Sequence, residues 1–139
     1  MALLIGLGLA VAVAIFARVV GLDRDRAFYP TVLIIVGSYY VLFAAMAGSM
    51  AGIRLEILGF LAFAGAAVLG FRTSLWVVAA GLALHGLFDF ARLGSWPAPG
   101  APEWWPDFCG GFDVAAAVVL GALLLAKKGG AARQRGVGR

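Results

Sequence analysis

Long apolar runs alternate with short polar segments along the whole chain. Five of these runs approach the roughly 20 residues that a helix needs to cross the hydrocarbon core of a bilayer. They lie at about residues 2–20, 28–48, 54–71, 74–93 and 107–126. The pattern therefore predicts an all-α integral membrane protein, built as a bundle of five transmembrane helices.

The third run is the weak point of this prediction, because 54–71 is short. Only Arg72 and Thr73 separate it from the fourth run, so two full crossings would have to form a tight hairpin. The alternative is four spans, with the third segment partly re-entrant. A signal peptide carries basic residues before its apolar segment, and the first run has none. It is therefore expected to be a retained span.

Composition supports a membrane location. Of the 139 residues, 63% are hydrophobic and only 13% are charged, with a mean hydropathy of +1.00. Soluble domains are about 25% charged, so this excess of apolar residues is more than a buried core requires. The 20 glycines suit close packing of membrane helices. The basic residues lie at the ends of the apolar runs and in the tail, so the expected partner is the lipid bilayer and not nucleic acid.

The distribution of basic residues predicts the orientation, since cytoplasmic loops are enriched in Lys and Arg. With five spans and the N-terminus outside, nine basic residues lie inside and two outside. The inside segments carry Arg18, Arg24, Arg26, Arg72, Lys127, Lys128, Arg133, Arg135 and Arg139, and the outside segments carry Arg54 and Arg92. We therefore expect an inner-membrane protein with its C-terminus in the cytoplasm. Residues 127–139 are expected to form a basic, flexible cytoplasmic tail.

Four ionisable residues of the predicted spans are candidates for a functional role: Glu56, His85, Asp89 and Asp113. An ionised group at the centre of a membrane helix costs about 2.5–3.5 kcal/mol on insertion scales, so each needs a partner or a function. The predicted orientation places all four in the outer half of the bilayer. Arg92 follows Asp89 near the outer end of the fourth span.

Helical spacing predicts that these residues converge. Positions 81, 85, 89 and 92 form one stripe of the fourth helix, which carries His85, Asp89 and Arg92. Asp113 lies in a stripe of small residues on the fifth helix, where close helix contacts form. We expect His85 to reach Asp113 directly or through one water, with Asp89 close enough to complete the network. If the network is structural, Asp89 is expected to pair with Arg92 one turn away. Of Tyr39 and Tyr40, at most one can face this cluster, because adjacent residues diverge by about 100°.

Three interpretations of the cluster remain open. It can be an interhelical hydrogen-bond network, a proton- or cation-handling site, or a metal or acid–base catalytic site. The metal candidates are His85, Asp89 and Asp113, a hard ligand set that suits Mn, Fe or Mg better than structural zinc. Cys109, one turn before Asp113, is interpreted as an inert buried thiol. The sequence contains no complete catalytic motif and requires no cofactor.

The segment between the last two predicted spans, GSWPAPGAPEWWP, combines prolines and tryptophans. Pro97, Pro99, Pro102 and Pro106 oppose regular structure there. Trp96, Trp104 and Trp105 are expected at the membrane interface, where indole rings are enriched. An aromatic belt is one interpretation, and a ligand lid or docking platform is the other.

For function, the sequence favours a structural or accessory subunit that packs against itself as a homo-oligomer or against a larger membrane complex. The alternatives are a proton- or cation-coupled transporter or channel component, and a membrane enzyme with a His/carboxylate site under the tryptophan-rich loop. Transport predicts a water-accessible path to the inner face. Catalysis predicts a blind pocket that opens outside.

Overall fold

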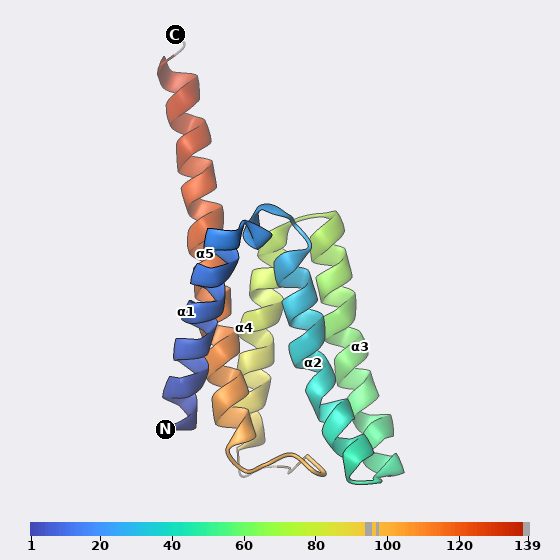
Figure 1. The fold of residues 1–139 in the computed structure, drawn as a ribbon. Helices are drawn as coiled ribbons and strands as arrows, with labels where there is room; N and C mark the ends of the chain where they lie inside the picture. The colour runs from blue at the N-terminus through green and yellow to red at the C-terminus, as the bar shows by residue number, and fades with distance from the viewer. Residues whose placement is uncertain (94–95, 97, 138–139) are drawn as a thin grey trace.

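The computed structural model describes residues 1–93, 96 and 98–137, and this part of the chain is helical, without strands. Five long helices are joined by short connections (Figure 1). Their bounds are α1 Ala2–Val20, α2 Phe28–Met46, α3 Met50–Arg72, α4 Leu75–Arg92 and α5 Trp105–Val137, with a short 3₁₀ turn η1 at Leu22–Arg24. Each of the five is long and apolar enough to cross a membrane. The predicted fold class, an all-α membrane bundle of five helices, is confirmed.

The third helix is longer than the sequence indicated. α3 is one unbroken helix of 23 residues that begins at Met50, four residues before the predicted start. Ser49 caps it, because its side chain accepts a hydrogen bond from the Gly52 N–H at 3.1 Å. At this length α3 can cross the bilayer, so the re-entrant alternative is not what the structure shows.

The fifth helix extends beyond its predicted bounds at both ends. Trp105 and Pro106 belong to its first turn, where proline is tolerated because its missing N–H needs no helical partner. At the other end α5 continues as helix to Val137, where the sequence suggested a flexible tail after residue 126. A helix that is already formed extends at little cost through residues such as alanine, lysine, glutamine and arginine. Figure 1 shows this end projecting beyond the other helices.

The first helix does not pack in chain order, whereas the other four do. α1 packs along α5, α5 along α4, and α2 and α3 pack against each other and against α4 (Figure 1). Glycines permit the close approach of α1 and α5. A Cβ on Gly6 would overlap the Phe108 carbonyl oxygen, and a Cβ on Gly111 would lie 2.7 Å from the Leu3 carbonyl oxygen. Small residues thus join the first helix to the last.

The connections alternate between the two ends of the bundle. The N-terminus, the α2–α3 turn and the α4–α5 connection lie at one end, and the α1–α2 connection, the α3–α4 turn and the C-terminus lie at the other (Figure 1). At the latter end Arg26 joins two connections, because its Nη2 donates to the carbonyls of Gly70 at 3.3 Å and Thr73 at 3.2 Å. Below, "the loop end" means the end of the bundle that carries the α4–α5 connection.

Candidate functional site

The polar stripe of α4 is buried inside the bundle. His85 is 1% exposed, Asp89 0% and Arg92 5%, so none of the three side chains faces lipid. The stripe arises because residues three and four positions apart share a helix face. Gly86 lets α5 approach this region, since a Cβ there would lie 3.0 Å from the Gly110 carbonyl oxygen.

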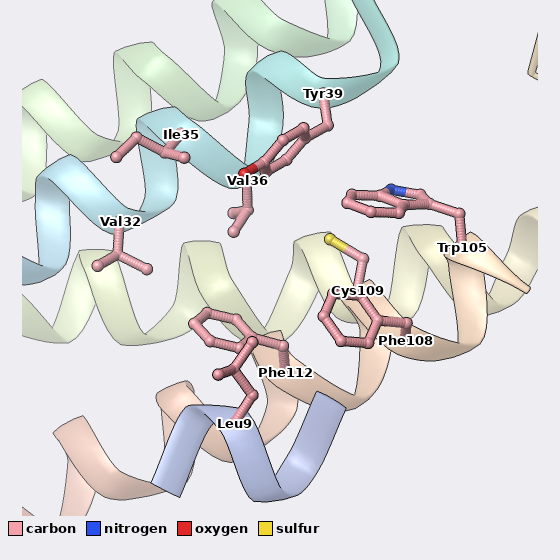
Figure 2. A pocket seen from close by; sticks show the side chains of 9 residues that line it. All are labelled: Leu9, Val32, Ile35, Val36, Tyr39, Trp105, Phe108, Cys109 and Phe112. Carbon is pink, nitrogen blue, oxygen red and sulfur yellow. The ribbon is translucent and has the colours of Figure 1, made fainter. Parts of the chain in front are cut away.

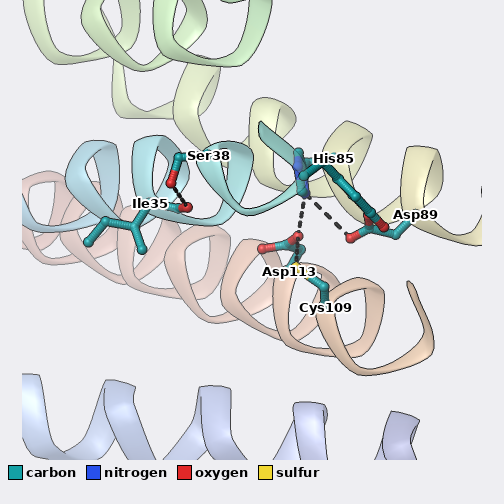
Figure 3. A network of polar contacts seen from close by, with 7 residues as sticks. Ile35, Ser38, His85, Asp89, Cys109 and Asp113 are labelled. Atoms are coloured by element: carbon teal, nitrogen blue, oxygen red, sulfur yellow. Dashed lines mark hydrogen bonds and ion pairs between the residues drawn. The ribbon is translucent and has the colours of Figure 1, made fainter. Parts of the chain in front are cut away.

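His85 is the centre of the site (Figure 3). Its Nδ1 lies 2.6 Å from Asp113 Oδ2 and 3.5 Å from Asp89 Oδ2. The contact with Asp113 that helical spacing predicts is therefore present. With Asp113 as a carboxylate, which only accepts, this contact corresponds to the tautomer in which Nδ1–H donates to Asp113. The Phe63 ring meets the imidazole edge to face at 4.6 Å between centroids and limits its rotation.

Asp89 has a partner that the sequence did not identify. Tyr40 of α2 donates its hydroxyl hydrogen to Asp89 Oδ1 at 2.7 Å. Tyr40 is therefore the tyrosine that faces the cluster, whereas Tyr39 packs against Trp105 at 4.9 Å between ring centroids. The bond to Tyr40 holds one oxygen of Asp89 and turns the other toward His85.

Arg92 pairs with Glu56, and the predicted Asp89–Arg92 pair is not formed. Arg92 Nη2 donates to both carboxylate oxygens of Glu56, at 2.8 and 2.7 Å, and both side chains are buried. The long arginine side chain crosses to α3 instead of folding back on its own helix. Its guanidinium carbon lies 4.2 Å from the centroid of the Tyr40 ring and 4.7 Å from that of Phe88. These rings cover the buried charge by cation–π contact.

The network leaves several buried polar atoms without a partner. Among the described residues, Asp89 Oδ2, Asp113 Oδ1 and two donors of Arg92, Nε and Nη1, have no hydrogen bond. Most buried polar groups in proteins are hydrogen-bonded, and a group that is not needs an explanation. The two aspartate oxygens most need a partner, because Asp89 and Asp113 are both fully buried.

Cys109 belongs to the site, which the sequence interpretation as an inert thiol did not anticipate. Its Sγ lies 3.7 Å from Asp113 Oδ2, one turn away on α5. One ligand atom each from His85, Asp89, Cys109 and Asp113 can be chosen so that all four lie within 4.8 Å of one another. The sequence feature that pointed to this contact is the four-residue spacing of Cys109 and Asp113, since it places both on one helix face.

Pockets at the loop end reach the network. A pocket of about 400 Å³ is lined by Tyr40, Arg92, Trp96 and Glu103 among others, and a second, of about 600 Å³, by Glu56 and Arg92 among others. Tyr40 is the direct link, because it lines the first pocket and also bonds Asp89. Two pockets near the opposite end are lined by none of the cluster residues.

A third cavity, of about 470 Å³, is apolar and meets the site from the side (Figure 2). Residues of α1, α2 and α5 line it, and the Cys109 sulfur points into the space between Val36 and Trp105. Cys109 therefore separates this cavity from the charged cluster. An apolar wall on this side keeps the dielectric around the cluster low and strengthens its electrostatic interactions.

The tryptophans occupy different positions near the loop end. Trp96 and Trp104 are about half exposed, at 47% and 53%. Trp105 begins α5 and packs against Phe43 at 4.8 Å between ring centroids, so it is part of the bundle and not of the loop. Pro99 and Pro102 lie in the described loop, whereas Gly94, Ser95 and Pro97 lie outside the described residues. Membrane-interface positions for these indoles stay a prediction.

The fold and the site together define a class: a five-helix membrane protein with a buried, partly unsatisfied His/carboxylate/thiol cluster. Comparison with known proteins adds no further identity, because no family model, curated protein or solved structure matches the chain. Function must therefore be argued from the geometry of the site.

Proposed function

We propose that this is a cation-binding membrane protein, in which the cluster of His85, Asp89, Cys109 and Asp113 holds a proton or a metal ion. The observation that carries the proposal is the pair of fully buried carboxylate oxygens, Asp89 Oδ2 and Asp113 Oδ1, that lack a hydrogen bond among the described residues. Two aspartates face a single imidazole there. A buried carboxylate without full compensation is costly, and a bound cation supplies that compensation.

A purely structural network fits these features less well. Networks that hold helices together are most stabilising when every member is satisfied, and a half-satisfied network is less favourable than apolar packing. Here two acids approach the same Nδ1, at 2.6 and 3.5 Å. Such repulsion between like charges is typical of sites that sacrifice stability for binding or catalysis.

The pockets favour a site reached from the loop end over a transmembrane pathway. Tyr40 and Arg92 line space there, next to the cluster. A pathway would also need cluster residues to line space toward the opposite end, and the two pockets near that end involve other residues. Of the functions considered from the sequence, a binding or catalytic site under the tryptophan-rich loop therefore has more support than a transporter.

Asp89→Asn tests this proposal. The amide keeps the shape of the side chain and an oxygen that can accept the Tyr40 hydrogen bond, but it removes one negative charge. We expect the variant, purified in detergent with a chelator present, to unfold at the same or a higher temperature than the wild type. A site that is destabilised without its cation gains stability when its excess charge is removed.

The matched control is Asp23→Asn at the opposite end of the bundle. Asp23 pairs with Arg18 at 2.9 Å, and no second acid crowds that pair. The Asp23 side chain is 2% exposed and that of its partner Arg18 is 63% exposed, so solvent screens the pair from one side and its loss should lower the unfolding temperature. If Asp89→Asn also lowers the unfolding temperature, the cluster is structural and the cation proposal fails.

A structural or accessory role is the second candidate. The polar network joins α2, α3, α4 and α5, which favours a part in holding the bundle together. As a subunit, the protein would assemble as a homo-oligomer or within a larger membrane complex through its apolar surface. Light scattering of the purified protein in detergent measures the mass of the assembly, and a monomer at all concentrations would exclude the homo-oligomer.

We also propose that the loop end faces outward, so that the N-terminus is outside the inner membrane and the C-terminus is cytoplasmic. The nine-to-two bias of basic residues supports this orientation, and one of the two exceptions, Arg92, is bound to Glu56 inside the bundle. In a Cys109→Ala background, a membrane-impermeant maleimide should label Glu103→Cys in intact cells. Thr73→Cys should react only after lysis, and the reverse pattern would invert the orientation.

A further inference from the structure

We infer that the cluster binds a divalent transition-metal ion, of the class of Zn²⁺ or Co²⁺, through His85 Nδ1, Cys109 Sγ and one oxygen each from Asp89 and Asp113. This inference deepens the proposed function and rests on it, since it names the cation. The four side chains come from two adjacent helices, α4 and α5, and all are buried.

Two of the distances between ligand atoms match a tetrahedral site. Zinc binds nitrogen, oxygen and sulfur at about 2.0–2.3 Å, so neighbouring ligand atoms in a tetrahedron lie about 3.3–3.7 Å apart. His85 Nδ1 lies 3.5 Å from Asp89 Oδ2, and Cys109 Sγ lies 3.7 Å from Asp113 Oδ2. The 2.6 Å contact between His85 Nδ1 and Asp113 Oδ2 would have to lengthen by at least about 0.7 Å to match, and the four ligand atoms, which lie within 4.8 Å of one another, would have to adjust around the ion.

The partners of the cluster orient its ligand atoms. Tyr40 holds Asp89 Oδ1 and leaves Oδ2 directed at the site. Phe63 restricts the His85 ring from the side. Metal ligands in proteins are normally oriented in this way by a surrounding layer of hydrogen bonds and packing. Asp89 Oδ2, the oxygen that faces His85, has no hydrogen-bond partner among the described residues, and a metal ion at the site can satisfy it.

Cys109 determines the metal class. The sequence alone suggested His85, Asp89 and Asp113 as a hard set for Mn, Fe or Mg. A thiolate in the set shifts the preference toward softer ions such as Zn²⁺ and Co²⁺. An apolar cavity lies on the other side of Cys109.

Binding exchanges protons for the metal ion. As the metal–sulfur bond forms, the S–H bond of Cys109 breaks and its proton passes to solvent. His85 changes tautomer: it loses the Nδ1 proton and takes up one proton at Nε2, so the ring stays neutral and Nδ1 offers its lone pair to the metal. The aspartates bind as carboxylates, and no electron is transferred.

Cobalt titration tests the inference on the full-length protein, purified in detergent and stripped with a chelator. We expect one Co²⁺ per chain, with the visible absorption of a tetrahedral ion and a thiolate-to-cobalt charge-transfer band. Zn²⁺ should displace it. Cys109→Ser should lose the charge-transfer band and bind Co²⁺ at least tenfold more weakly, and Asp113→Asn should lose binding altogether.

The control is Asp25→Asn, which removes an acid from the α1–α2 connection and should bind Co²⁺ as the wild type does. Circular dichroism of each variant establishes that the helices are intact. If the wild type binds no Co²⁺ while Asp89→Asn is as stable as the wild type or more stable, the metal inference fails and the site holds a proton. If Cys109→Ser keeps the band and the affinity, the four-ligand set is wrong.

Discussion

Arg92→Met should lower the free energy of unfolding by about 3–5 kcal/mol, the range found when one partner of a buried ion pair is removed. The substitution keeps an apolar side chain of similar length between Tyr40 and Phe88. It leaves the Glu56 carboxylate, which is 5% exposed, without the guanidinium that binds both of its oxygens. Thermal or denaturant unfolding in detergent, followed by circular dichroism, measures the loss.

Two further variants isolate the cause. Arg54→Met removes an exposed arginine from α3 and should change stability by no more than about 0.5 kcal/mol. Arg92→Met combined with Glu56→Leu removes the orphaned charge as well and should recover most of the stability, because apolar replacements of buried pairs are often neutral. If the double variant is as unstable as Arg92→Met alone, lost packing and not the uncompensated charge is responsible.

The helices were predictable because a membrane constrains length and polarity together. Five apolar runs of bilayer length predict five helices, and the structure has them. The 81, 85, 89, 92 stripe was predictable for the same reason, since an ionisable residue in lipid is costly and helical spacing places all of these positions on one face. His85 meets Asp113 because consecutive helices joined by a short connection pack side by side.

The partners of the long side chains were not predictable in this way. The Arg92 side chain is long enough to reach either Asp89, on its own helix, or Glu56, on α3. Residue spacing along α4 cannot reveal a partner on another helix. The sequence did not show which of Tyr39 and Tyr40 faces the cluster, because the rotation of α2 about its axis depends on the helices packed against it. Cys109 is buried, as the sequence suggested, but its 3.7 Å contact with Asp113 Oδ2 depends on side-chain positions that helical spacing alone does not give.

The position of α1 is the largest feature that the apolar pattern left open. Consecutive helices usually pack together, yet α1 packs along α5, the last helix. The reason lies in two glycines, Gly6 and Gly111, which face each other's helices and bring the backbones together. Such contacts stabilise membrane helices by close packing, since lipid provides no hydrophobic force between them.

Gly6→Ala should therefore destabilise the α1–α5 pair, although alanine is the better helix former. A Cβ at residue 6 would overlap the Phe108 carbonyl oxygen, which is backbone and cannot rotate away, so the helices must separate. Overpacking of this kind costs about 1–3 kcal/mol.

Gly8→Ala is the control, because its Cβ would meet nothing within 4 Å and Gly8 is exposed. Gly8→Ala causes no clash and gains the higher helix propensity of alanine, which is about 1 kcal/mol in a helix interior. Unfolding temperatures in detergent should thus move in opposite directions, downward for Gly6→Ala and upward or not at all for Gly8→Ala. Equal shifts for the two variants would mean that α1 does not pack against α5 through Gly6.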